Sequence, residues 1–386
     1  MKSLNIVLKT VERCNLNCSY CYFFNSLDQS YVGRPKFISI STIEHIVNFI
    51  RVGIDDLGLE EVTISLHGGE PLMQPKHEFR LMLESFNSLS SLVKIDYVTQ
   101  TNATLVNQNW IDLLNEYNVG VGVSIDGSQD CHDKYRLDHY GRGSYDSVLR
   151  GIELLMKGLN DTPGSLTVIN PEFSGREIYK HIVGLGFKRL DFLLPDMNHN
   201  LQPSFSITSY SNYLISIFDE WVLDNNPEIH VRKLKSMIRQ VLGRKSLTYA
   251  SGIMSDDHIP LISIRSDGAI CSTDELVSTD PKTVLFTGKY VTDTSLKEVI
   301  DSSNFREIAI AQKTAPQKCM SCKWYMACGA GNLVHRFSDD QRFNNHSIYC
   351  EALQDIYTHL YQHLVVSGVP EDGIKNYLST HPGALI

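Results

Sequence analysis

Three cysteines in the spacing C-x3-C-x2-C constrain this chain more than any other feature of its sequence. Cys14, Cys18 and Cys21, the triad, follow the first apolar run of the chain. Three thiolates can hold three corners of a cubane iron–sulfur cluster, which normally takes four cysteines. No fourth cysteine lies nearby in the sequence, so one iron would keep a free coordination position. A zinc site or unlinked core thiols are the alternatives, but zinc sites usually combine paired C-x2-C motifs with further ligands close by.

Length, charge and cysteine usage narrow the class of protein. At about 150 residues per domain, a chain of 386 residues predicts two or three domains. The net charge of −9 argues against a nucleic-acid partner, which would favour a basic face. No apolar run approaches the ~18 residues of a membrane span, and the N-terminal segment does not read as a signal peptide. Nine cysteines grouped in C-x-x-C patterns then favour metal ligation in a reducing cytoplasm over disulfides.

Strands and helices are expected to alternate through the first half of the chain. Apolar periodicity predicts strands at residues 4–10, 61–66, 93–100, 119–125, 165–169 and 188–194. It predicts helices at 42–56, 78–90, 108–117, 145–158 and 175–185, with Ser41 or Thr42 as the N-cap of the first. Such alternation predicts an α/β fold in which crossover helices cover a parallel sheet. The unusual residues follow the strands, at the sheet edge where such folds place their sites.

The C-terminal half has a different pattern. Residues 208–243 predict two helices separated by Asn225-Asn226-Pro227 and carry no chemical motif, so we interpret them as a bridge. Residues 261–271 predict a β-hairpin with its turn at Asp267-Gly268. Five of the nine cysteines lie between residues 271 and 350, and an amphipathic helix is expected at about 351–366.

The first half resembles the radical SAM superfamily. The resemblance rests on the triad, on His67-Gly68-Gly69-Glu70-Pro71, on Thr101-Asn102-Ala103 and on Ser124-Ile125-Asp126-Gly127. It implies a partial (β/α)6 TIM-like barrel that binds S-adenosylmethionine (SAM) at the open iron of a 4Fe–4S cluster. One electron from that cluster cleaves SAM to a 5′-deoxyadenosyl radical.

The same resemblance implies which residues contact SAM. Glu70 would accept a hydrogen bond from the SAM ammonium group, and Arg136 would face the SAM carboxylate, with Arg142 as a rival. Gly68 and Gly69 would let the backbone approach the ligand. The full expected set is Gly68, Gly69, Glu70, Asn102, Ser124 and Arg136.

The C-terminal part resembles the SPASM domain, which carries auxiliary 4Fe–4S clusters in peptide-modifying radical SAM enzymes. The resemblance implies one complete set of four ligands, the C-terminal cysteine set: Cys319, Cys322, Cys328 and Cys350. The chain departs from the family pattern at Asn332, where a cysteine is expected, and it has no cysteine between Cys131 and Cys271. We therefore expect two 4Fe–4S clusters, one that binds SAM and one auxiliary cluster. Cys271 and Cys131 are then expected to be plain buried thiols.

These resemblances divide the chain into four expected regions. They are a radical SAM partial barrel at 1–200, a helical bridge at 201–258, a SPASM domain at 259–352, and a C-terminal helix and tail at 353–386.

Asp274 is a candidate catalytic base. It lies three residues after Cys271, where a carboxylate of the related sulfatase maturases takes a proton from the substrate. A carboxylate base suits a reaction in which loss of a hydrogen atom is followed by loss of a proton and an electron. The alternative is a solvated aspartate in a turn.

The expected enzyme is a radical SAM oxidoreductase acting on a peptide. The first hypothesis is maturation of a ribosomally made precursor peptide by net two-electron oxidation, which forms a side-chain cross-link (a C–C cyclophane or a thioether). The second is conversion of a Cys or Ser to formylglycine, as in anaerobic sulfatase maturases. A third, of another class, is a non-catalytic iron–sulfur protein for electron transfer or peptide binding. An electron donor such as flavodoxin or ferredoxin is expected, with no nucleic-acid or membrane partner.

Overall fold

The computed structural model describes residues 2–247 and 261–380, which form two compact units. The first unit holds the described residues of 1–125, 129–165 and 256–307, and the second holds those of 126–128, 166–255 and 308–386. Residues 261–307 therefore fold with the N-terminal part of the chain. The expected boundary between bridge and SPASM domain, at 258 and 259, lies outside the described residues, as does the end of the expected tail. The limits of the four expected regions stay predictions.

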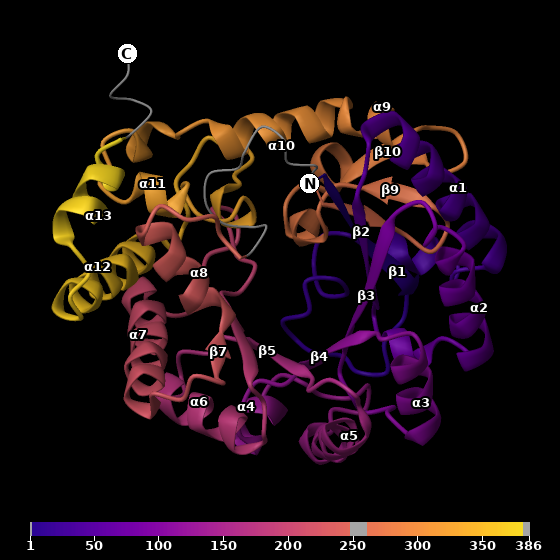
Figure 1. The fold of residues 1–386 in the computed structure, drawn as a ribbon, viewed down its shortest axis with the longest axis horizontal. Coiled ribbons are helices and arrows are strands. Elements are labelled where there is room, and N and C mark those ends of the chain that lie inside the picture. The colour runs from indigo at the N-terminus through magenta and orange to yellow at the C-terminus, as the bar shows by residue number, and fades with distance from the viewer. Residues whose placement is uncertain (1, 248–260, 381–386) are drawn as a thin grey trace. The chain divides into compact units, whose positions relative to one another are not determined.

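A largely parallel sheet forms the core of the first unit (Figure 1). Its strands are, in order across the sheet, β10 (Phe286–Tyr290), β9 (Ala269–Cys271), β8 (Ile262–Ile264), β1 (Ser3–Val11), β2 (Glu61–Gly68), β3 (Lys94–Thr101) and β4 (Gly120–Ser124). The strands from β8 to β4 run parallel, whereas β8 and β9 form the antiparallel hairpin expected at Asp267-Gly268. β1 therefore pairs with β2 on one side and, in the register Ile6 to Ile262, with the late strand β8 on the other.

Helices follow the strands of the first unit, and α1, α2 and α3 lie beside β1, β2 and β3 in Figure 1. The helices of this unit are α1 (Ile40–Leu57), α2 (Lys76–Asn87), α3 (Gln108–Glu116), α4 (Gln129–Asp133), α5 (Tyr145–Gly158) and α9 (Leu296–Ile300), and α10 (Ser303–Lys313) begins in it. The predicted N-cap of α1 is wrong. The Ser39 hydroxyl accepts a hydrogen bond from the Thr42 N–H at 3.1 Å, so the helix begins at Ile40.

The second unit contains most of β5 and a group of packed helices. Its elements are β5 (Gly164–Val168), α6 (Gly175–Gly184), β6 (Arg189–Leu193), α7 (Ile207–Asp224), β7 (His230–Val231), α8 (Arg232–Val241), α11 (Tyr325–Cys328), α12 (Cys350–Val366) and α13 (Glu371–Leu378). The two expected bridge helices are α7 and α8, and both pack against α12 (Figure 1). Asn225 ends α7 in the left-handed conformation, with φ of 47°.

Single-turn helices complete the chain. Five are 3₁₀ turns, namely η1 (Ser30–Gly33), η2 (Pro71–Met73), η3 (Asp274–Ser278), η5 (Gln317–Cys319) and η6 (Val334–Arg336), and η4 (Pro281–Leu285) is a π turn.

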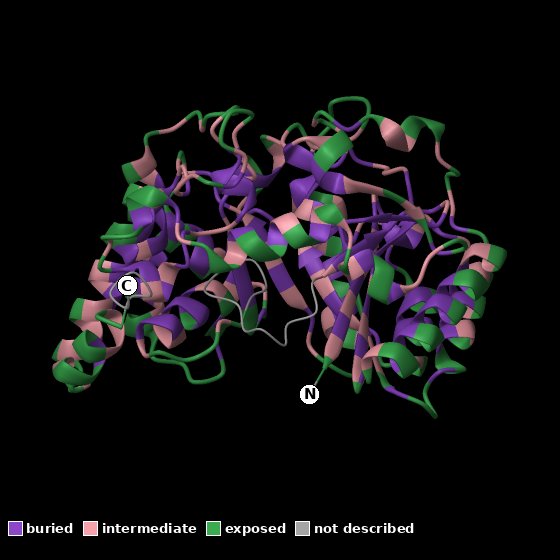
Figure 2. Cartoon of the chain, turned by 90° about the horizontal axis from the view of Figure 1, so that it is seen from above, coloured by how far each residue is buried: buried purple, intermediate pink, exposed green. Residues whose placement is uncertain are grey.

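Burial follows the strand periodicity in β2 but not at the end of β1. β2 alternates between buried and half-buried residues, and Figure 2 shows buried strands with helices exposed on their outer faces. In β1, the last four residues are all buried, including Lys9 and Thr10. A lysine is almost never fully buried unless it is paired, so the carboxyl end of β1 is where a polar site is expected.

The predicted fold class is confirmed. Along the chain, β1 to β6 are each followed by helices, which gives the six strand–helix repeats expected from the sequence. The fold is α/β with a largely parallel sheet. None of the described helices is long and apolar enough to cross a membrane.

Candidate functional site

The loop that carries the triad follows β1 and is held by residues 135–139. The Asn17 N–H donates to the Leu137 carbonyl at 2.7 Å, and the Ser19 N–H donates to the Tyr135 carbonyl at 3.1 Å. The three thiols are partly exposed, and none forms a disulfide. Backbone bonds between two segments far apart in the sequence therefore fix the loop without using the thiols, which stay available as ligands.

Gly68 and Gly69 let β2 lie against the start of this loop. The Gly69 N–H donates to the Val11 carbonyl at 2.7 Å, and the next N–H donates to the Arg13 carbonyl at 3.1 Å. A Cβ at Gly68, whose φ is +149°, would lie 2.3 Å from the Val11 oxygen, and a Cβ at Gly69 would lie 2.1 Å from the Arg13 oxygen. Close approach of the protein's own backbone thus requires both glycines, whereas the sequence analysis assigned them to close approach of a ligand.

A methyl group at Gly69 should disrupt the triad loop. In Gly69→Ala the new Cβ meets rigid backbone, so the loop must move, at a cost of about 1–3 kcal/mol in the free energy of unfolding. We expect less iron bound at the triad, measured by iron and sulfide analysis after anaerobic reconstitution. Gly33→Ala is the matched control because no atom lies within 4 Å of a Cβ at Gly33. Unchanged iron content in Gly69→Ala would contradict the role given to this glycine.

Glu70 joins the ends of β2 and β3 from a buried position. One carboxylate oxygen accepts hydrogen bonds from the Leu72 N–H at 3.0 Å and the Thr101 hydroxyl at 2.6 Å, and the other accepts from the Asn102 N–H at 2.8 Å. Burial raises the pKa of Glu70 to about 7, although these three bonds lower it. Two carboxylate oxygens can accept about four hydrogen bonds, so there is capacity for one more donor, as the expected ammonium contact requires.

Asn102 lies directly against the triad loop. Its amide nitrogen is 3.8 Å from the Cys14 sulfur and donates to the Asn15 side-chain oxygen at 3.0 Å. Burial and the Glu70 carboxylate raise the pKa of Cys14. Ser124, at the end of β4, accepts a hydrogen bond from the Gln100 amide at 2.9 Å. The strand ends thus bring Asn102 to the triad, and Ser124 is held one strand further along the sheet.

The two candidate arginines differ in environment. Arg136 is 7% exposed, and its guanidinium lies 5.5 Å from the ring centre of Tyr20, which belongs to the triad loop. The Arg142 side chain is 73% exposed and pairs with Asp138 at 2.7 Å, as an ordinary surface salt bridge does. The structure supports Arg136, not Arg142, as the arginine near the triad.

Asp274 lies in a buried polar cluster with Lys9 of β1. The Lys9 ammonium is 2.6 Å from the Asp274 carboxylate and 3.2 Å from His67 Nδ1, and the Tyr22 hydroxyl donates to the same carboxylate. Burial alone would raise the pKa of Asp274, but Lys9 and His67 outweigh it and lower the pKa. Burial and Lys9 lower the pKa of His67 to about 4, so this imidazole is neutral at pH 7.

Asp274 is therefore no solvated turn residue, which was the alternative raised by the sequence. It is 9% exposed and lies next to Tyr22, the residue that follows the last triad cysteine. Sequence analysis did not identify Lys9, His67 or Tyr22 as members of this cluster. A lysine within an apolar strand is the signal that could have indicated it.

A second buried ionic network lies beside this cluster. Arg265 forms two hydrogen bonds to Glu12, at 2.9 and 2.8 Å, and a third to Asp28 at 3.0 Å. All three residues are at most 3% exposed. The Arg265 guanidinium also lies 4.9 Å from the ring centre of Phe23, just after the triad. The network ties the β8–β9 hairpin to the triad loop.

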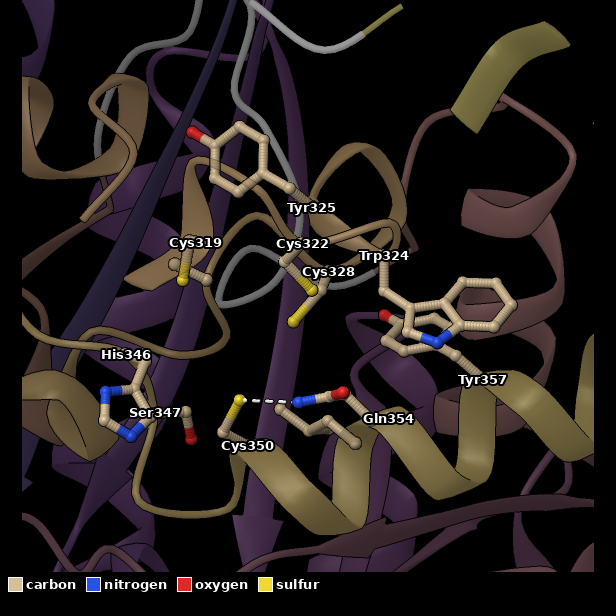
Figure 3. A pocket seen from close by; sticks show the side chains of 12 residues that line it. Cys319, Cys322, Trp324, Tyr325, Cys328, His346, Ser347, Cys350, Gln354 and Tyr357 are labelled. Carbon is tan, nitrogen blue, oxygen red and sulfur yellow. Dashed lines mark hydrogen bonds between the residues drawn. The ribbon is translucent and has the colours of Figure 1, made fainter. Parts of the chain in front are cut away.

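The C-terminal cysteine set surrounds one cavity in the second unit. Figure 3 shows the sulfur atoms facing a common space, with Trp324, Tyr325 and Tyr357 among the side chains around it. The cavity has an empty volume of about 330 Å³, including its opening to solvent. Burial raises the pKa of Cys319 to about 11 and, with the neighbouring thiols, raises that of Cys328. Thiolates formed at these four cysteines would repel one another, and a bound cationic metal cluster would neutralise that charge.

The backbone directly after Cys328 adopts an unusual conformation. Gly329, Ala330 and Gly331 have φ of 59°, 67° and 81°, three successive residues in the left-handed region. This conformation costs a residue with a side chain about 1–2 kcal/mol, so Ala330 is strained here. A Cβ at Gly331 would lie 2.8 Å from the Ser347 Cβ. Strain of this kind persists only where the surroundings hold it, and it is common at binding sites.

Thiolates are the usual ligands of iron–sulfur clusters, so the chemistry of both cysteine sets is compatible with one. Among residues 2–247 and 261–380, no group of three or more Cys, His, Asp or Glu side chains is placed to hold one metal ion. In a cubane cluster each thiolate binds a different iron, so the sulfur atoms stand further apart than around one zinc ion. Trp324 adds an orphaned polar atom beside the C-terminal cavity, because its buried indole N–H has no hydrogen-bond partner in the described structure.

The two remaining cysteines are buried thiols. Cys271 is fully buried against Val277 and Leu285, and burial raises its pKa to about 12. Cys131 is 1% exposed, in α4. Asn332 accepts a hydrogen bond from the Val334 N–H at 3.2 Å. These environments fit the expectation that neither cysteine is a cluster ligand.

The chain is similar in sequence to known proteins. Residues 8–182 match the family model of the radical SAM superfamily. The chain is 25% identical over 371 residues to a cysteine-type anaerobic sulfatase-maturating enzyme of Clostridium novyi, covering 92% of this chain and 95% of the relative. It is 26% identical over 362 residues to a serine-type anaerobic sulfatase-maturating enzyme of Bacteroides thetaiotaomicron, covering 87% and 84%.

Solved structures share the fold. Native anSMEcpe with bound AdoMet superposes with a TM-score of 0.82 at 22% identity, over 94% of this chain and 99% of that one. Streptococcus suis SuiB bound to its precursor peptide SuiA superposes with a TM-score of 0.59 at 14% identity, over 91% and 76%. The chain is therefore a homologue of the anaerobic sulfatase-maturating enzymes, with a radical SAM domain at residues 8–182.

Proposed function

We propose that this radical SAM enzyme oxidises a Cys or Ser side chain of a peptide to formylglycine. The observation that carries the proposal is the similarity to sulfatase-maturating enzymes of both the cysteine and the serine type, over 84% or more of each protein. Cross-link formation, the first hypothesis from the sequence, becomes the second candidate because it has no comparable support among these relatives.

The residues near the triad fit the cofactors of such an enzyme. The triad would hold three irons of a 4Fe–4S cluster, and the remaining capacity of Glu70 suits the ammonium group of SAM. Arg136 supplies a buried positive charge for the SAM carboxylate, and Asn102 lies beside Cys14. When bound, the reduced cluster and SAM supply a radical that removes a hydrogen atom from the substrate.

In this proposal Asp274 takes the substrate's proton. Loss of a hydrogen atom from the carbon next to a thiol or hydroxyl makes that group more acidic, so a weakly basic carboxylate is sufficient. A cysteine that loses a hydrogen atom, a proton and an electron becomes a thioaldehyde, and water converts this to the aldehyde and hydrogen sulfide. A serine gives the aldehyde directly. The Lys9 ammonium holds Asp274 ionised, ready to accept the proton.

The electron that leaves the substrate needs an acceptor. An auxiliary 4Fe–4S cluster held by the C-terminal cysteine set would provide one, since four thiolates leave no open iron for SAM. An external donor such as flavodoxin or ferredoxin would supply the electron that starts the reaction.

One observation favours the second candidate, a cross-linking peptide maturase. The described residues hold a single complete four-cysteine set, and Cys271 is buried among apolar side chains instead of joining another. The resemblance drawn from the sequence implies the full two-cluster pattern for the sulfatase maturases, so this chain would depart from them in its auxiliary site.

Tandem mass spectrometry of modified peptides separates these candidates. Peptides with a single Cys, Ser or Ala at the same position are incubated with enzyme, SAM and a reductant without oxygen. Formylglycine appears as a hydrazide-reactive aldehyde at Cys or Ser, with normal fragmentation on both sides and no change in the Ala peptide. Loss of two hydrogens with fragmentation blocked between two residues, in a peptide encoded beside the gene, would instead establish the cross-link. If the reduced protein cleaved no SAM, the non-catalytic alternative would stand.

A further inference from the structure

The C-terminal cysteine set receives a side-chain hydrogen bond that the proposed reaction does not use. Gln354 Nε2 lies 3.2 Å from the Cys350 sulfur, and Figure 3 shows the bond. Cys350 is the first residue of α12, and side chains four residues apart on a helix are neighbours. The amide must be the donor if Cys350 binds metal, because a coordinated thiolate can only accept.

We propose that Gln354 raises the reduction potential of the auxiliary cluster by donating this N–H···S hydrogen bond to Cys350. The inference rests on the auxiliary cluster proposed above. Reduction adds negative charge to a cluster, so a donor at one of its sulfur atoms stabilises the reduced state more than the oxidised state. Gln354 is thus a positioning residue that acts through Cys350 and makes the cluster a better electron acceptor.

The position of Gln354 limits both the size of the effect and the side effects of its removal. Trp324 and Tyr357, at most 3% exposed, line the same cavity, whereas Gln354 is exposed. Its loss therefore removes little packing. Solvent at this exposed position weakens the bond by competing for the donor, so we expect a moderate change in potential without loss of the cluster.

The test uses the full chain with the triad cysteines replaced by alanine, so that the auxiliary cluster alone gives the spectroscopic signal. Its midpoint potential is measured by redox titration with EPR detection. Gln354→Leu should lower the equilibrium constant for reduction three- to tenfold, where tenfold corresponds to about 59 mV for one electron. Gln362→Leu, the same change at an exposed glutamine on α12, is the matched control and should leave the potential unchanged.

Two further readouts distinguish a hydrogen bond from a general effect of the substitution. Gln354→Lys keeps a donor and adds a positive charge. The midpoint potential of its cluster should therefore equal or exceed that of the parent, which is the chain with only the triad cysteines replaced. Proton ENDOR of the reduced parent should show an exchangeable proton coupled to the cluster that is missing in Gln354→Leu. If the leucine variant lost its cluster, the parent spectrum alone would still test the proposal, because absence of a coupled exchangeable proton there would overturn it.

Different results would contradict the role of Gln354 and the presence of the auxiliary cluster. An intact cluster signal with the same potential in Gln354→Leu and its parent would overturn the role of Gln354 and leave the auxiliary cluster in place. A parent with no cluster signal and no iron would show that the C-terminal cysteine set binds no cluster, and the inference would fall with it.

Discussion

Replacing Cys14, Cys18 and Cys21 together by alanine should abolish formation of 5′-deoxyadenosine from SAM. We expect no substitute ligand, because the other described cysteines belong to the C-terminal set or, like Cys131 and Cys271, are fully buried thiols. The assay is anaerobic incubation of reduced protein with SAM, followed by chromatography. About four irons should be lost per chain, the content of one cubane cluster.

Two matched controls show whether the triad is specific. Cys131→Ala and Cys271→Ala each remove a buried thiol outside both sets, and both variants should keep their iron and cleave SAM. SAM cleavage that survived in the triple variant would refute the assignment of the triad. Loss of cleavage in Cys271→Ala would instead mean that this cysteine binds metal.

Asp274→Asn should reduce peptide oxidation about 10²- to 10⁴-fold, the usual contribution of a general base. Formation of 5′-deoxyadenosine should continue because the asparagine leaves the triad unchanged, so the two activities become uncoupled. The measurement compares oxidised peptide with 5′-deoxyadenosine in the same reaction. Glu275→Gln removes the neighbouring carboxylate and should keep the two products coupled. Equal rates of peptide oxidation in Asp274→Asn and the wild type would exclude Asp274 as the base.

The Lys9–Asp274 pair also gives this prediction a pH signature. The folded state lowers the pKa of Asp274. The pair therefore stabilises the fold at pH values above the ordinary aspartate pKa of about 3.9, and this stabilisation is lost only as the pH falls through the lower pKa of the folded state. The rate of peptide oxidation by the wild type should therefore not fall between about pH 7 and pH 5 through protonation of Asp274. In Lys9→Met the ammonium no longer opposes the effect of burial, so the pKa of Asp274 rises. The rate of peptide oxidation should then fall as the pH is lowered through this range.

Local sequence features predicted the strand–helix order and the cysteine motifs well. β1, α3 and α5 lie within a residue or so of their predicted limits because their apolar periodicity is strong. The predicted N-cap of α1 was wrong because Ser39, two residues before Ser41, accepts the hydrogen bond from the Thr42 N–H. Short elements such as β7 and α13 carry too few residues to show a period.

Contacts between distant segments were not predictable from one sequence. The pairing of β1 with β8 and the contact of Lys9 with Asp274 join residues more than 250 positions apart. No local pattern specifies such a partner, so Asp274 came only from resemblance and the two buried ionic networks were missed. The ion pair of Lys9 follows from burial, which becomes visible only when the sheet is assembled.

The pairing of β1 with β8 has a consequence for how the chain folds during synthesis. Until residue 264 has left the ribosome, β1 has β2 on one side and unpaired backbone groups on the other. An open sheet edge is a template for pairing with other chains, and closing a contact across so many residues is slow. A chain terminated before residue 261 would therefore be prone to aggregate, although it contains the complete radical SAM segment. In this protein the late strand β8 closes the free edge of the first strand, and the hairpin that β8 begins leads to Asp274, which contacts Lys9.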